Sequence, residues 1–181
     1  MLKPSDKWTW YYDDREGYLM LDLGQDMVFK TNLSRKLLVD CALAINEFSV
    51  DDAAAFEIFR EQLSYLSLSE PRQAELALYC VAAKRFHKTV QPKSWFFDGL
   101  SSGDESPKEG DLIRMRNAHS DGYFIVLEVG ESASLCACID LDGFNLTSTK
   151  SLVFGQAIKV MHDRISVANH EFLSHPIAMV G

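Results

Sequence analysis

Residues 7–23, KWTWYYDDREGYLMLDL, decide the fold of the first half of the chain. Trp8, Trp10 and Tyr12 recur at every second position, a period that is typical of a β-strand. A polar loop with a glycine follows, and the run YLMLDL alternates again, so the two runs predict a β-hairpin. After one more turn, the run MVFK predicts a third strand, which completes a three-stranded antiparallel meander.

The dense aromatic rings at 8–12 allow three interpretations: a stacking platform for bases or sugars, a docking face for a protein, or part of a hydrophobic core. A platform for nucleic acid needs cations between the rings, and only Lys7 lies beside them. The chain also carries a net charge of −8, which opposes nonspecific binding to phosphates. We therefore expect these rings to serve chiefly as scaffold.

Two amphipathic segments after the meander predict helices that pack on the sheet. The run DDAAAFEIFREQLSYL has acidic residues at its start and one apolar stripe. The residues of this stripe are Phe56, Phe59, Leu63 and Leu66. The second segment, AELALYCVAA, follows a Ser67-x-x-Glu70 pattern and Pro71, which together signal a helix start. Because its middle is apolar on nearly all sides, we expect it to be the most buried helix.

The second half of the chain changes character. A connector rich in Gly, Ser and acidic residues leads to five short runs that resemble strands, with no helical segment between them. One of these expected strands is the alternating run FNLTSTKSLVF. This pattern predicts an α+β protein whose N-terminal sheet packs with helices and whose C-terminal domain is a small antiparallel β-barrel or sandwich. The expected parts are an N-terminal domain at 1–97, a connector at 98–110, a barrel-like domain at 111–167 and a frayed tail at 168–181.

Composition limits the class of protein. At 181 residues and 47% hydrophobic content the chain can build a substantial core. It has no run of 18 apolar residues and no apolar segment near its start that would act as a secretion signal, so we expect a soluble, cytoplasmic protein without membrane association. The four cysteines are Cys41, Cys80, Cys136 and Cys138, and we expect reduced, buried thiols rather than disulfides or a zinc site.

The motifs that would indicate catalysis are missing from the sequence. Its one Gly-x-Ser-x-Gly match, at residues 99–103, lies in the connector rich in Gly and Ser and not between a strand and a helix, so it does not predict a nucleophile elbow. The sequence has no P-loop and no Gly-x-Gly-x-x-Gly motif, and no local pattern singles out a nucleophile among its Ser and Cys residues. Of the five histidines, His87 lies at a predicted helix end, His119 in a predicted turn, His162 in a run that resembles a strand, and the other two in the tail, so we expect surface or structural roles for them. We therefore predict a protein that is not an enzyme and binds neither a metal nor another cofactor.

A basic tract is the feature that most favours protein binding. From 76 to 97 there is no acidic residue, and this window carries four cations and an aromatic residue that could anchor a partner. The tract consists of Lys84, Arg85, Lys88, Lys93 and Trp95. The plainer explanation is a helix end whose cations satisfy the helix dipole, followed by a solvated loop. A third possibility is a nucleic-acid-associated adaptor with a small barrel, although the second half carries a net charge of −5.

Three segments carry a resemblance to a known family. They are KPSDKWTWYYDDREGYLMLDL with MVFKTNLSRKLL, the later QPKSW, and the closing GQAIKVMHDRI. In these segments, and in register from about Leu2 to Val167, the chain resembles the Z-ring-associated protein C (ZapC) family of gammaproteobacteria. The match is weakest around residues 40–49 and 98–108.

The resemblance implies a cytoplasmic factor without enzymatic activity that acts in cell division and septation. Such a factor binds polymers of the tubulin-like GTPase FtsZ, bundles them laterally and stabilises the Z ring at midcell. It also implies an α/β domain followed by a barrel-like domain. By position, Lys88 and Lys93 correspond to basic residues that flank the family's P-K-S-W motif, and Leu21 to a strand that lines an apolar pocket. On this basis we expect Leu21 to contact the partner or a second copy, and Trp8, Trp10 and Tyr12 to shape the pocket.

Overall fold

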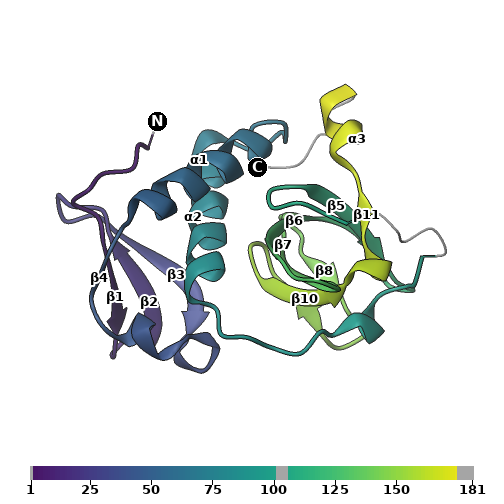
Figure 1. Ribbon diagram of the computed structural model, residues 1–181, viewed down its shortest axis with the longest axis horizontal. Helices are drawn as coiled ribbons and strands as arrows, with labels where there is room; N and C mark the ends of the chain where they lie inside the picture. Colours follow the sequence, from purple (N-terminus) through teal and green to yellow (C-terminus); the bar gives the residue numbers. More distant parts are fainter. Residues whose placement is uncertain (1, 101–105, 175–181) are drawn as a thin grey trace.

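The computed structural model describes residues 2–100 and 106–174 of the chain (Figure 1). The described residues form a mixed α/β protein with antiparallel sheets. The first sheet has the strand order β3-β2-β1-β4. Its strands are β1 (Thr9–Asp13), β2 (Tyr18–Asp22), β3 (Val28–Ser34) and β4 (Asn46–Glu47). The first three form the expected meander, but the sheet has four strands rather than three, because β4 pairs with the start of β1. Two residues are too few to give a strand pattern in a sequence.

The aromatic face of β1 lies against the core. Trp8 and Trp10 are buried, and their rings lie 5.0 and 5.7 Å from the ring of Phe48. Leu21 on β2 is paired in register with Trp10 and is also completely buried. Tyr12 is half-buried at the border of the same cluster. The alternation in the sequence therefore identified the inward face correctly, and these rings form part of the hydrophobic core.

Two helices follow, α1 (Val50–Leu63) and α2 (Glu70–Phe86). Ser49 and Asp52 form a capping box at the start of α1. Ser69 caps α2 by accepting a hydrogen bond from the backbone of Arg72, with Pro71 in the first turn, so the helix starts two residues later than the Ser67 pattern suggests. The predicted stripe of α1 is buried, and the middle of α2 is the most continuously buried helical segment, as expected.

The second sheet has five strands in the order β10-β7-β6-β5-β11. They are β5 (Leu112–Arg116), β6 (Asp121–Val129), β7 (Ala133–Cys138), β10 (Ala157–Met161) and β11 (Ser166–Val167). No ladder joins the edge strands β10 and β11, although only a short 3-10 turn separates them along the chain. The sheet is therefore curled but open, and the predicted barrel-like closure is not confirmed.

Both faces of this second sheet are buried. Ile125 and Ala137 face a core that also contains the helices and the first sheet, whereas Phe124, Val126 and Cys136 face a second core. Continuous burial explains why β6 and β7 read as uninterrupted apolar runs. The helices α1 and α2 consequently lie between the two sheets (Figure 1), and a single hydrophobic core joins the two halves of the chain.

Two expectations for the second half were wrong. The run FNLTSTKSLVF alternates like one strand but forms a small hairpin of β8 (Phe144–Asn145) and β9 (Ser151–Leu152). Thr147 makes the turn, because its hydroxyl accepts hydrogen bonds from the backbone of Thr149 and Lys150.

Beyond Val167, where we expected a frayed tail, the chain forms α3 (Asn169–Ser174), and Phe172 is fully buried against Tyr123. The rest of the predicted tail lies outside the described residues. Within the described ranges, no helix combines the length and apolar character needed to span a membrane.

Candidate protein-binding surface

The two cations at the end of α2 are engaged within the protein. Lys84 forms an ion pair with Glu109, which lies beyond the connector. Arg85 forms an ion pair with Asp52, whose side chain is only 5% exposed, and also donates a hydrogen bond to the backbone carbonyl of Glu47. Both cations thus hold α2 to other segments, and their predicted contact with a partner stays a prediction.

Asp52 is the centre of a small polar network. Its carboxylate accepts hydrogen bonds from the Trp10 indole at 3.1 Å, the Ser49 backbone at 2.9 Å and the Arg85 guanidinium. A buried carboxylate is stable only when such donors satisfy it. The sequence indicated an acidic helix start here, but it gave no sign that Trp10 and Arg85 would meet at this residue.

The segment that follows α2, residues 87–97, is called the linker below, and its cations are accessible. Lys88 and Lys93 are exposed, and neither has an ion-pair partner among residues 2–100 and 106–174. Trp95 is 70% exposed, which is unusual for a large aromatic side chain. The basic tract therefore separates into two parts. Its first two cations support the fold, and its later residues project from the linker.

Backbone hydrogen bonds hold this linker against both halves of the protein. The Lys88 amide donates to the Leu37 carbonyl, and the Lys93 amide donates to the Lys159 carbonyl on β10, each at 2.8 Å. In Figure 1 the linker runs along the bottom of the view from α2 toward the second sheet. Lys93 is thus held at a defined position relative to β10.

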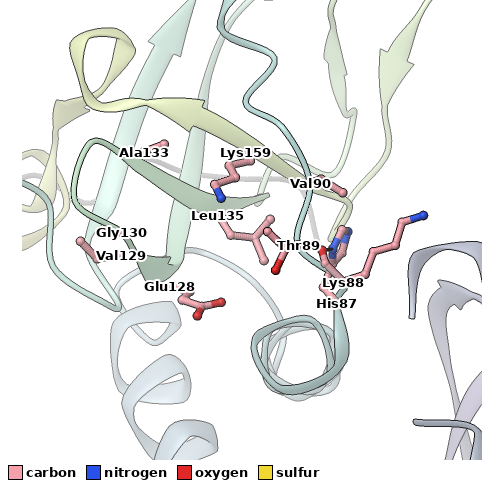
Figure 2. A pocket seen from close by; sticks show the side chains of 10 residues that line it. All are labelled: His87, Lys88, Thr89, Val90, Glu128, Val129, Gly130, Ala133, Leu135 and Lys159. Atoms are coloured by element: carbon pink, nitrogen blue, oxygen red, sulfur yellow. Dashed lines mark hydrogen bonds between the residues drawn. The ribbon is translucent and has the colours of Figure 1, made fainter. Parts of the chain in front are cut away.

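A small pocket lies on one side of the linker (Figure 2). Its volume is about 120 Å³, and its lining includes His87, Glu128 and Lys159. The side chain of Lys88 extends away from the other labelled residues rather than into the space between them (Figure 2). This pocket is large enough for a few water molecules, and we assign no ligand to it.

A much larger groove, which we call the basic groove, opens between the first sheet and the β8–β10 region. Its volume is about 1070 Å³. The charged residues of its lining are Lys30, Lys93, Lys150 and Lys159, together with His87. Except for Lys93, the sequence did not single out these lysines, because they are far apart along the chain. One signal was available: Lys150 lies in a polar turn between two apolar runs. Only the fold shows that the four share one space.

The predicted apolar pocket beside Leu21 is not one of these two cavities. Leu21 is 0% exposed and lies in the core, and it lines neither the small pocket nor the basic groove. Trp8 and Trp10 are buried in the same cluster. The proposed roles of Leu21 in partner binding and of the aromatic residues in shaping a pocket therefore stay predictions.

Side chains elsewhere that could act as nucleophiles or metal ligands lie where they have no access to a substrate or do not gather into a site. Ser134 Oγ lies 2.8 Å from His162 Nε2, but Ser134 is fully buried and lines neither cavity, so a substrate has no access to it there. Within the described parts of the chain, no three His, Cys, Asp or Glu residues gather closely enough to hold a metal ion.

The thiols of the second half and of α2 are inert. Burial raises the pKa of the Cys80 and Cys136 thiols and raises the pKa of Cys138 to about 12, so all three stay protonated near neutral pH. All four cysteines are free, as expected, but Cys41 is exposed rather than buried.

Comparison with known families and proteins gives a consistent result. The family model described as "Cell-division protein ZapC, N-terminal" matches residues 1–88, and "Cell-division protein ZapC, C-terminal" matches residues 89–171. A protein of Vibrio cholerae named "Cell division protein ZapC" is 62% identical over 180 residues, which is 99% of each chain. Proteins with the same name from Vibrio vulnificus and Photobacterium profundum are 60% and 44% identical, each over 100% of both chains.

These names agree with a role in cell division, and they include no catalytic activity. They give no support to the alternative of a nucleic-acid-associated adaptor.

Proposed function

The chain belongs to the ZapC family of cell-division proteins, and from this membership we propose that it binds polymers of FtsZ directly. In this proposal it acts without catalysis, promotes lateral bundling of the filaments and stabilises the Z ring at midcell in the cytoplasm. The resemblance of its sequence to the family, described above, is the reason for naming FtsZ as the partner.

One observation supports this proposal most directly: Lys88 and Lys93 are exposed and unpaired within the described residues, and the exposed Trp95 follows Lys93 by two residues. FtsZ polymers are acidic, and a protein of net charge −8 repels an acidic partner over most of its surface. An encounter therefore depends on a local basic region that steers the partner, and on an aromatic side chain that anchors it.

Bundling sets a further requirement. A protein that joins two filaments needs either two binding faces or a second copy of itself. The linker and the basic groove adjoin each other through Lys93, so they make one face. Sedimentation of the protein alone and with FtsZ distinguishes a monomer with two faces from a protein that self-associates.

The test is cosedimentation with FtsZ polymers of the Lys88→Glu/Lys93→Glu variant. We expect the variant to stay in the supernatant under conditions in which the unmodified protein pellets, and we expect its circular dichroism to remain native, because both side chains are exposed. The matched control is Lys3→Glu/Lys7→Glu, which makes the same change of net charge at two exposed residues near the start of the chain. Equal pelleting of the two variants would contradict the assignment of the linker.

A further inference from the structure

We propose that the outer face of the first sheet binds an extended, cationic segment of another protein. The outer face is the side that points away from α1 and α2, and its residues come from β1, β2 and β4. They are Thr9, Tyr11, Asp13, Met20, Asp22 and Glu47. This proposal goes beyond the proposed function and does not depend on it.

The strand register brings these residues to one side of the sheet. Tyr11 on β1 is paired with Met20 on β2, and Thr9 is paired in the same way with its neighbour on β2. Trp10, which lies between Thr9 and Tyr11, points to the opposite side and is buried in the core. Side chains at paired positions lie about 5 Å apart, so they form a continuous surface.

The outer face is separate from the surfaces described above. α1 and α2 pack on the other side of the first sheet, and the second sheet lies beyond them (Figure 1). Tyr11 and Met20 belong to neither hydrophobic core, and no outer-face residue lines the small pocket or the basic groove. Met20 is nevertheless buried, which means that its neighbours on the sheet pack around it. The outer face is therefore a closely packed surface on which a segment can lie.

The charge of the outer face is negative. Asp13, Asp22 and Glu47 contribute three carboxylates, and none of them has an ion-pair partner within residues 2–100 and 106–174. Backbone amides of the adjoining turns donate to Oδ1 of Asp13 and to Oδ1 of Asp22, each at 2.8 Å. These hydrogen bonds fix both carboxylates and leave the Oδ2 atoms for a ligand.

The Tyr11 ring lies between two of these carboxylates. Asp13 is two residues further along the same strand, and Asp22 lies diagonally across on β2, so each is about 7 Å away along the sheet. Burial raises the pKa of Tyr11, and the negative charges of Asp13 and Asp22 raise it further. A ring in such a negative field attracts a cation to its face, and the carboxylates can accept hydrogen bonds from that cation.

The first sheet already contains one contact of this kind. The Lys30 ammonium lies 4.7 Å from the centre of the Tyr18 ring and forms an ion pair with Glu16. Tyr11 has the same combination of ring and carboxylate, but within the described residues no cation lies over its ring. A cation of a partner can therefore take the position that Lys30 takes at Tyr18.

The chemistry of the outer face favours an arginine-bearing peptide. A planar guanidinium can stack on an aromatic ring while it donates hydrogen bonds to a carboxylate, whereas an ammonium is a compact point charge. The carboxylates are spread over three strands, so a segment with several cations fits them better than a single ion. Nucleic acid and anionic lipid are repelled by the same carboxylates.

The experiment measures the fluorescence anisotropy of a labelled peptide that alternates Arg and Ser, with a peptide that alternates Gln and Ser as the uncharged control. We expect saturable binding of the Arg peptide that weakens with added salt, and no binding of the Gln peptide. The variant Asp13→Asn/Asp22→Asn should lose about fivefold in affinity, because it removes two carboxylates and keeps an oxygen for each turn hydrogen bond. Tyr11→Thr should lose about threefold, because the ring is removed.

The matched control is Glu57→Gln/Glu61→Gln, which makes the same change of net charge at two exposed residues of α1. It should bind the Arg peptide like the unmodified protein. An equal loss of affinity in this control and in Asp13→Asn/Asp22→Asn would mean that only the net charge attracts the peptide, and the proposal would be wrong.

Three further outcomes would overturn the proposal. They are unchanged affinity in Asp13→Asn/Asp22→Asn, equal binding of the two peptides, and a self-association of the unmodified protein in sedimentation that this variant loses, which would make a second copy the occupant. If circular dichroism shows that the double variant is misfolded, Glu47→Gln decides, because this side chain is exposed. It should lose about twofold in affinity, and an unchanged affinity would contradict the proposal. No FtsZ is present in these measurements, so their failure leaves the proposed function intact.

Discussion

The last turn of α2 and the linker that follows it contain the same kinds of residue in different surroundings. Lys84 and Arg85 face carboxylates of the protein itself, whereas Lys88 and Lys93 face solvent. In the sequence these four cations form one tract. A cation paired with an internal carboxylate helps to hold the fold together, and we infer that a cation without such a neighbour is more available to a partner. Three substitutions follow in decreasing order of expected effect on stability: Asp52 and Lys84 test this division, and Gly155 tests how the walls of the basic groove are held.

The largest effect is expected at Asp52. The Asp52→Ala variant removes the N3 residue of the α1 capping box, leaves the Trp10 indole without its acceptor and leaves Arg85 without its carboxylate. Removing one partner of a buried ion pair lowers the free energy of unfolding by about 4 kcal/mol, because the other charge is left buried without a partner. Urea unfolding followed by circular dichroism measures the change. Asp51→Ala is the control, since Asp51 is exposed in the same helical turn. If Asp52→Ala lowered the free energy of unfolding no more than the control does, the contact of Arg85 with Asp52 would not stabilise the fold, and the helix end would not differ from the linker in this respect.

A moderate effect is expected at Gly155, which holds the walls of the basic groove together. Its carbonyl accepts a hydrogen bond from the Asn32 side chain on β3 at 2.9 Å. Its φ is +82°, and a Cβ would lie 2.5 Å from Tyr79 Cδ2. We expect Gly155→Ala to lower the unfolding free energy by about 2 kcal/mol, measured by urea unfolding.

Gly17→Ala is the control for Gly155→Ala. Gly17 has a similar φ of +79°, and a Cβ there meets nothing within 4 Å. The difference between the two variants isolates the contact with Tyr79. Identical unfolding free energies would mean that the groove walls are not fixed by this close approach.

The smallest effect is expected at Lys84. The side chains of Lys84 and Glu109 are 34% and 32% exposed, so Lys84→Ala should cost only about 0.5 kcal/mol of unfolding free energy. We expect FtsZ pelleting to be unchanged, because the ammonium group is already paired. Lys108→Ala is the control at a nearby exposed lysine. If Lys84→Ala lost pelleting with FtsZ and the control did not, Lys84 would contact the partner, and the proposed difference between the helix end and the linker would be wrong.

The sequence predicted best those elements whose signals are local. The Ser67-x-x-Glu70 pattern with Pro71 predicted the start of α2 to within two residues, and the alternation from Trp8 onward identified the buried face of β1, because capping and period-two burial depend on neighbours a few residues apart. The pairing of β4 with β1 and the burial of Phe172 depend on distant segments, and no local pattern predicts either.

The candidate site shows the same limit. Lys88 and Lys93 were found because they stand together in a window without acidic residues. Lys30, Lys150 and Lys159 are each isolated from other cations along the chain, and they meet only because two sheets are placed on either side of α2. A property of the assembled surface, such as the absence of carboxylates around a groove, cannot be predicted before the topology is known.

The single core that joins both sheets to α1 and α2 has a consequence for how the protein unfolds. Each sheet buries one of its faces against a core that includes α1 and α2, so the two sheets should melt in one cooperative transition rather than as separate domains. Trp8 and Trp10 lie in the first sheet region, yet their fluorescence should report the loss of the second sheet at the same temperature. Although the sequence pattern suggests two domains, we expect the protein to unfold as one cooperative unit on heating.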